Sequence, residues 1–329
     1  MKTFPACLVA VLVMAGCSRS NDLTVASSTD ISTLDPFGMF SRVEIAFADH
    51  IFQTLTFFNP DMEVVPLLAS SWNRLEGDTT WTFHLQDGVR FHNGEVFDAA
   101  AVKFSLEIVL SRNDSGQTVG GASVAIPSAN IKSIKIVDPL TVNITTNGPK
   151  ALLPFYLSQI FMIAPAHYAD ASDAIRAENP VGTGPYVVEE RVRDSHVSLS
   201  RFVSYWGEPA LNDRVVFRVI PEVSTRIAEL ETGGVHIITD LPFDQAAILS
   251  SATGVHVASI PGGRRVMIGI TTSGGPKPLE DKRVRQALNY AIDFDAISAG
   301  LFGGSVERMS YIFNPPFSHP EIDAYPYDP

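Results

Sequence analysis

The clearest structural pattern in the chain is carried by residues 80–94, Thr80-Trp81-Thr82-Phe83-His84-Leu85-Gln86-Asp87-Gly88-Val89-Arg90-Phe91-His92-Asn93-Gly94. In 80–85, large apolar residues alternate with polar ones, which is the period of a strand with one buried face. Asp87-Gly88 predicts a hairpin turn toward a further extended segment at 89–92, and Asn93-Gly94 predicts a second turn. This part of the chain is therefore expected to form a half-buried antiparallel hairpin.

Strands and helices are expected on both sides of this hairpin. Asp98 is predicted to cap a helix whose apolar stripe includes Val102, Leu106 and Val109. Further strands are predicted at 23–27, 131–137, 140–145, 197–203 and 214–220, and helices at 44–55, 224–232 and 281–301, the last with Asp281 as its cap. The sequence therefore predicts a mixed α/β, or α+β, chain.

The amino terminus has the features of a leader. Lys2 is followed by an apolar run at 4–14, which is far shorter than the roughly 20 residues that a membrane span needs. Small residues precede Cys17, as in a bacterial lipoprotein. Residues 1–16 are therefore expected to be a signal peptide, and Cys17 to carry a lipid that anchors the chain in the periplasm or cell envelope. An ordinary secretory leader that leaves a free thiol remains the alternative.

Composition narrows the class of protein further. The chain has two cysteines, and the first lies in the leader, so no disulfide framework is expected. A length of 329 residues favours two domains. The formal net charge of −12 makes nucleic acid an unsuitable partner.

A search for catalytic, cofactor and metal motifs finds none with the required spacing. Gly-x-Ser-x-Gly, Ser-x-x-Lys, His-Glu-x-x-His and Cys-x-x-Cys do not occur. Gly182-Thr183-Gly184 is followed by a predicted strand rather than a helix, so it is interpreted as a structural turn and not as a phosphate loop. His84 and His92 fit alternating strand patterns and are expected to face solvent. The sequence predicts no enzyme, no metal site and no cofactor.

Four segments in one order carry a family resemblance. They are Ala69–Trp72 with Trp81–Gly94, then Pro180–Tyr186, then Tyr205–Gly207 with Val216–Pro221 and Thr225–Arg226, and finally Asp281–Asp293. Together they resemble extracellular solute-binding protein family 5, the oligopeptide, dipeptide and nickel binders of ABC importers. Tyr186 and Trp206 are interpreted as structural, because they lie in segments that binders of very different ligands share.

The resemblance implies a two-lobed flytrap of the type II periplasmic binding protein kind, with an extra subdomain. Lobe I is expected at 22–53 and 178–262, the inserted subdomain at 54–177, and the start of lobe II at 263–329. Binders of this family are usually much longer, so the second lobe is expected to be incomplete. The acidic residue that peptide-binding members use for the ligand's amino terminus would then lie beyond the chain, and peptide specificity does not carry over.

The same resemblance implies a monomer that captures a peptide or other small solute between its lobes and delivers it to ABC permease and ATPase subunits. The residues expected to line the cleft are Met39, Phe40, Glu44, Gln159, Phe161 and Arg264. Each has a structural alternative, since aromatic side chains are more often core residues and charges are often at the surface. Two other functions stay open: a fragment that no longer binds, and a periplasmic enzyme or sensor on a similar scaffold.

Overall fold

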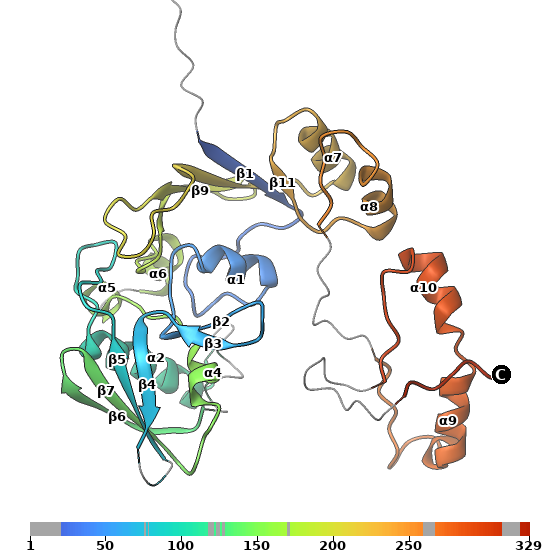
Figure 1. The fold of residues 1–329 in the computed structure, drawn as a ribbon, viewed down its shortest axis with the longest axis horizontal. Helices are drawn as coiled ribbons and strands as arrows, with labels where there is room; N and C mark the ends of the chain where they lie inside the picture. The colour runs from blue at the N-terminus through green and yellow to red at the C-terminus, as the bar shows by residue number, and fades with distance from the viewer. Residues whose placement is uncertain are drawn as a thin grey trace, which may run out of the picture. The chain divides into compact units, whose positions relative to one another are not determined.

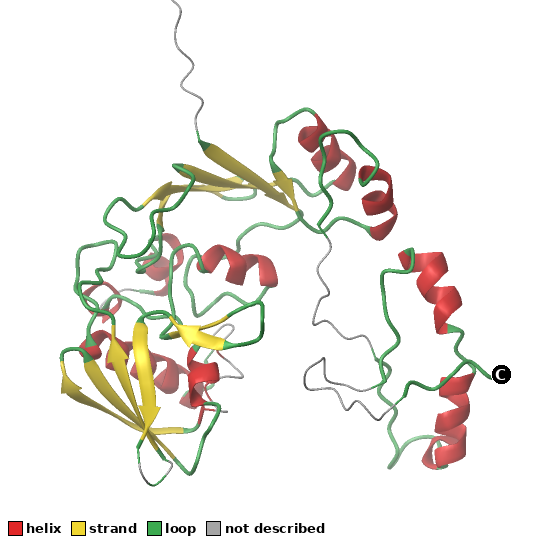
Figure 2. Cartoon of the chain, in the orientation of Figure 1, coloured by secondary structure: helices red, strands yellow, loops and turns green. Residues whose placement is uncertain are grey.

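The computed structural model describes residues 21–75, 77, 79–117, 122, 126, 129–169, 172–258, 267–310 and 323–329 (Figure 1). The chain divides into two units, Met1–Thr239 and Asp240–Pro329, each with its own internal packing. Helices and strands both occur in the first unit, whereas the described residues of the second form helices and loops without a strand (Figure 2).

A five-stranded sheet forms one part of the first unit. Its order is β11-β1-β10-β9-β8, and β1 lies parallel to both of its neighbours while the other pairs are antiparallel. The first strand of the chain thus lies between two strands that come much later in sequence. The bounds are Asp22–Ser27 (β1), Tyr186–Val192 (β8), His196–Arg201 (β9), Arg214–Val219 (β10) and Ile237–Ile238 (β11).

Helices and one buried arginine hold this sheet to its surroundings. Helix α1 (Arg42–Ala48) packs on β10 through Phe47, whose ring centroid lies 5.2 Å from that of Phe217. The guanidinium of Arg191, on β8, donates to the carbonyls of Ile31, Ser32 and Ala177, which ties the sheet to the loop after β1 and to helix α6 (Asp173–Glu178). Helix α7 (Val223–Glu231) precedes β11 in the chain and contacts it.

A second, antiparallel sheet has the order β4-β5-β7-β6 and is covered on one face by helix α2 (Ala99–Asp114) (Figure 1). Asp98 caps this helix as expected, because its side chain accepts from the amides of Ala100 and Ala101. Phe83, Phe91 and Leu106 are completely buried in a core that continues to the five-stranded sheet. The other elements here are β2 (Thr56–Phe58), β3 (Val64–Pro66), β4 (Ala69–Arg74), β5 (Thr80–Leu85), β6 (Ile131–Asp138), β7 (Thr141–Thr146), α4 (Leu153–Leu157) and α5 (Pro165–Ala169).

The second unit contains α8 (Phe243–Leu249), a 3-10 turn η2 (Lys277–Glu280), α9 (Lys282–Tyr290) and α10 (Phe294–Phe302). Phe243 packs edge-on against Phe302 at 5.5 Å, which joins α8 to α10. The apolar stripe predicted for 281–301 is largely uncovered within the described residues, with Leu288 45% and Ile292 41% exposed. Across the described parts of both units, none of the helices has the length and apolar character that crossing a bilayer requires.

The expected strands and the mixed α/β class are confirmed, but two helix predictions are wrong in extent. The helix expected at 44–55 ends at Ala48, because the carbonyls of His50, Ile51 and Gln53 instead accept from Tyr186, Gly184 and Met162. The helix expected at 281–301 is two helices, because the side chain of Asp293 accepts from the amide of Ala296 and starts a new one. The hairpin expected between 80–85 and 89–92 is also wrong: β5 pairs with β4 and β7, and the segment at 89–92 is reduced to a single bridge between Arg90 and Val96.

The predicted lobe boundaries stay predictions. The five-stranded sheet lies within 22–53 and 178–262, and the four-stranded sheet lies within 54–177. The division between the two units falls between Thr239 and Asp240, rather than at 262 and 263.

Candidate functional site

The loop after β1 leads into α1 through a closed hydrogen-bond system around Glu44. Ser41 caps the helix by accepting from the amide of Glu44, and the carboxylate of Glu44 accepts in turn from Ser41, Phe40 and both donors of Ser32. Burial by itself raises the pKa of Glu44, but these hydrogen bonds outweigh it and hold the pKa below 4.5. The charge of Glu44 is therefore used to fix the shape of the loop.

The other two predicted residues of this loop differ sharply in exposure. Met39 is completely buried in the core, so its side chain supports the loop from within. Phe40, its neighbour, is 57% exposed, which is unusual for a large aromatic side chain. Phe40 is thus the residue of the three that offers apolar surface to a ligand.

Gln159 and Phe161 follow α4. Phe161 forms an antiparallel bridge with Thr54, and its ring lies 5.7 Å from that of Phe52. Both predicted side chains are partly exposed. The structure thus places Gln159 and Phe161 on one short segment held by residues 52–54. Cys17 and Arg264 lie outside the described residues.

A buried amide that the sequence analysis missed organises this region. The side-chain oxygen of Gln53 accepts from the Thr183 hydroxyl at 3.0 Å and from the Trp206 indole at 2.9 Å, and its nitrogen donates to the Tyr205 hydroxyl at 2.8 Å. Its backbone carbonyl accepts from Met162 at 2.8 Å. Gln53 is therefore the common partner of three distant segments, and Trp206 has the structural role expected of it.

His92 connects two segments that lie far apart in the sequence, and its position differs from the solvent-facing one that was expected. It does not face solvent from a strand, but lies partly buried with both ring nitrogens bonded. The amide of Gly182 donates to Nδ1 at 3.3 Å, and the carbonyl of Gly184 lies 3.0 Å from Nε2. Because an amide nitrogen only donates and a carbonyl only accepts, the ring is neutral and carries its proton on Nε2. His84, by contrast, is exposed as expected.

The glycines of this segment are required by close backbone contact. A Cβ on Gly182 would lie 2.0 Å from the carbonyl oxygen of Ile51, and one on Gly184 would lie 2.6 Å from that of His50. Strand β8 follows directly, so the segment is a structural turn, as expected, and has no helix amino terminus to hold phosphate. Residues 182–184 are thus packed tightly between His92 and the 50–53 segment.

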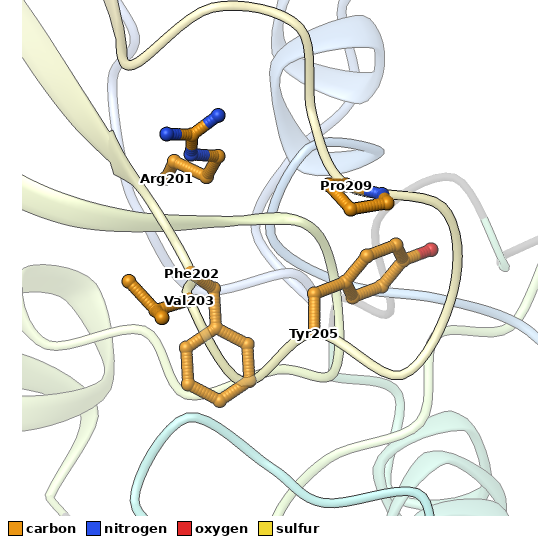
Figure 3. A pocket seen from close by; sticks show the side chains of 5 residues that line it. All are labelled: Arg201, Phe202, Val203, Tyr205 and Pro209. Carbon is orange, nitrogen blue, oxygen red and sulfur yellow. The ribbon is translucent and has the colours of Figure 1, made fainter.

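A shallow pocket lies at the end of β9, lined by Arg201, Phe202, Val203, Tyr205 and Pro209 (Figure 3). Its volume of about 220 Å³ is below the roughly 300 Å³ at which small-molecule pockets usually begin. The guanidinium of Arg201 is engaged by Asp213 and the carbonyl of Ala210. This pocket is therefore a weak candidate for a ligand site.

The described residues contain no group of three or more His, Cys, Asp or Glu side chains that could hold a metal ion. Glu189 and Glu190, adjacent on β8, pair with different residues, Arg214 and His196, and so do not converge.

Comparisons with known proteins agree with this architecture. The family model described as bacterial extracellular solute-binding proteins, family 5 middle, matches residues 63–329. The glutathione-binding protein GsiB of Escherichia coli O157:H7 is 29% identical over 327 residues, which cover 98% of this chain and 62% of that protein. The periplasmic binding protein DppA of Helicobacter pylori, solved with the peptide STSA, has a TM-score of 0.77 and 26% identity, over 93% of this chain and 64% of that one. NikA of Brucella suis, solved with Fe(III)-EDTA, also gives 0.77 and 26%, over 94% and 62%. The chain thus spans about 62% of the length of the curated relative.

Proposed function

Because the chain belongs to family 5 of the bacterial extracellular solute-binding proteins, we propose that it is the substrate-binding component of an ABC importer. It captures a peptide or a similar small solute between two lobes and delivers it to the permease and ATPase subunits of the transporter. The observation that carries the proposal is the family match over residues 63–329. The relatives bind glutathione, a peptide and an iron chelate by their names, which supports a small polar solute as the class of ligand.

The proposed cleft combines side chains of the described residues with Arg264, which lies outside them. Phe40, Gln159 and Phe161 supply contact surface, with Arg264 at the crossing between lobes, while Met39 and Glu44 hold the loop behind them. A solute shifts the balance between open and closed forms only by its higher affinity for the closed form. The lobes are proposed at 22–53 with 178–262 and from 263 onward, with 54–177 as the inserted subdomain.

The cellular setting is part of the proposal. Residues 1–16 act as a signal peptide, Cys17 carries the lipid, and the monomeric protein is held at the cell envelope. Cys17→Ser is expected to remove the lipid mass from the native protein and release it into the soluble fraction. An unlipidated wild-type protein would contradict the anchor without affecting the binding function.

The test of function is ligand-dependent stabilisation without product. The full chain is heated with glutathione, with tri- and tetrapeptides and with nickel–histidine in turn. A ligand at about 100 times its Kd is expected to add about 2.7 kcal/mol to the free energy of unfolding. The ligand is then recovered and weighed by mass spectrometry; a chemically altered ligand would favour an enzyme on this scaffold. No stabilisation by any member of the panel would favour a fragment that does not bind.

A further inference from the structure

His92 stands at the start of a continuous chain of contacts that ends at the proposed ligand segment. It holds Gly182 and Gly184, and the amide of Gly184 donates at 2.9 Å to the carbonyl of Ile51. Two residues on, the carbonyl of Gln53 accepts from Met162, and Thr54 bridges to Phe161. The 51–54 segment therefore bears His92's partners on one side and residues 161–162 on the other.

Proton uptake at His92 is incompatible with this arrangement. A second ring proton would have to be placed on Nδ1, which already accepts from the Gly182 amide. Two donors would then face each other, and the Gly182 amide would lose its acceptor. Gly182 has no room to move toward Ile51, because even a Cβ there would overlap the Ile51 carbonyl. The protonated ring must therefore separate from 182–184.

The surroundings of His92 do not compensate the added charge. The ring of Phe202 packs edge-on against it at 4.9 Å. Burial lowers the pKa of His92 below its ordinary value of 6.5, against the hydrogen bond to Gly184, which raises it. Most of the titratable side chains of the elements around it are bonded elsewhere: Arg90 to Gly94, Glu95 to Ala166 and His167, His50 to Ala46, Tyr186 to Asn212 and Tyr205 to Gln53. Burial raises the pKa of Asp49, which precedes His50 at the end of α1, to about 6, so its carboxyl group also takes up a proton between pH 7.5 and 5.

We propose that His92 is a pH-sensitive latch, whose neutral ring holds residues 182–184 against the 51–54 segment and whose protonation loosens both that contact and the 159–162 segment. The consequence for solute, a weaker grip in mildly acidic surroundings, rests on the proposed function. The latch itself is a property of the ligand-free chain.

The direction of the effect follows from proton linkage. The released state has the ordinary pKa of 6.5 and the latched state a lower one, so the released state binds more protons below 6.5. The latch is complete above pH 6.5 and weakens as the pH falls toward the latched pKa. In that window the latch equilibrium shifts by at most about tenfold per pH unit.

Amide hydrogen exchange of the full, ligand-free chain between pH 7.5 and 5 tests this. After correction for intrinsic exchange rates, protection is expected to fall together in peptides covering 180–186 and 159–163, by up to about tenfold per pH unit below 6.5. His92→Asn keeps an acceptor near the Nδ1 position but cannot titrate, so the joint fall of protection in both peptides should be lost, and only the pH dependence that Asp49 contributes should remain. His84→Asn changes an exposed histidine in the same sheet region and should behave as wild type.

Three results would overturn the latch: constant protection in the wild type, the same fall in His92→Asn, or a fall in 180–186 alone. If His92→Asn does not fold, the imidazole nitrogen spectrum of the wild type decides. It should show a neutral ring protonated on Nε2 at pH 7.5, and proton uptake over the same window as the loss of protection. A chain that binds no solute but shows this behaviour would contradict the proposed function and leave the latch standing.

Discussion

Replacing Gln53 by alanine is expected to destabilise the first unit by about 3 kcal/mol. The substitution removes the acceptor of the Thr183 hydroxyl, which is completely buried, and that of the Trp206 indole, which is partly buried. An unsatisfied buried donor costs about 1–3 kcal/mol, so we assign about 2 kcal/mol to Thr183 and about 1 kcal/mol to Trp206, which water can reach. Since about 1.4 kcal/mol is tenfold, the folding equilibrium should fall more than 100-fold.

Tryptophan fluorescence in a urea titration measures this cleanly. All three tryptophans, at 72, 81 and 206, lie in the unit that ends at Thr239, so the signal reports on that unit alone. Gln159→Ala is the matched control, because the Gln159 side chain has no hydrogen-bond partner among the described residues. Its free energy of unfolding should stay within about 0.5 kcal/mol of wild type, while its solute affinity falls. A Gln53→Ala chain as stable as Gln159→Ala would refute the reasoning.

Four further substitutions test other contacts. Gly182→Ala should cost more than about 3 kcal/mol in the same urea titration, because its Cβ would overlap the Ile51 carbonyl. Gly300→Ala, in open space on α10 of the second unit, should raise the helix content seen by circular dichroism and stabilise this helix by about 1 kcal/mol. Phe83→Ala should cost about 3–5 kcal/mol by the same titration, since the side chain is completely buried, and a cost below about 1 kcal/mol would contradict that packing. At pH 7, Glu44→Gln should lower the free energy of unfolding by about 0.5–2 kcal/mol. Because the pKa of Glu44 in the folded protein lies below 4.5, the wild type itself loses this stability as the pH falls below 4.5, and the difference between the two proteins should shrink. A difference in stability that does not change with pH would argue against a charged carboxylate.

Helices and strands were predictable where the sequence pattern and the interaction that causes it lie within the same few residues. Alternation gave β5, and Asp98 gave the start of α2, because both signals act within a few residues. The end of α1 was not predictable in this way. The apolar period continues through Ile51 and Leu55, which are indeed buried, but the backbone carbonyls of His50, Ile51 and Gln53 pair with segments more than 100 residues away.

The residues of the site were harder to predict from the sequence, again because their partners lie in distant segments of the chain. Gln53 carries one available signal, a polar amide between the large apolar residues Phe52 and Leu55, but its three side-chain partners lie far along the chain. His92 was assigned to solvent because period-two patterns were extended past a turn, where the ring actually meets backbone from residues 182–184. Tertiary hydrogen bonds of this kind leave no periodic trace.

The position of β1 between two later strands governs the order in which its sheet can form. Asp22–Ser27 must wait for β10, which is synthesised about 190 residues later, and for β11 after that. At about 5–20 residues per second, the first strand spends some 10–40 seconds without a partner. During that interval the emerging chain presents an unpaired strand to chaperones and cannot close its sheet early. A polypeptide that threads through a translocation channel before folding has use for such a delay, and here the delay is built into the topology.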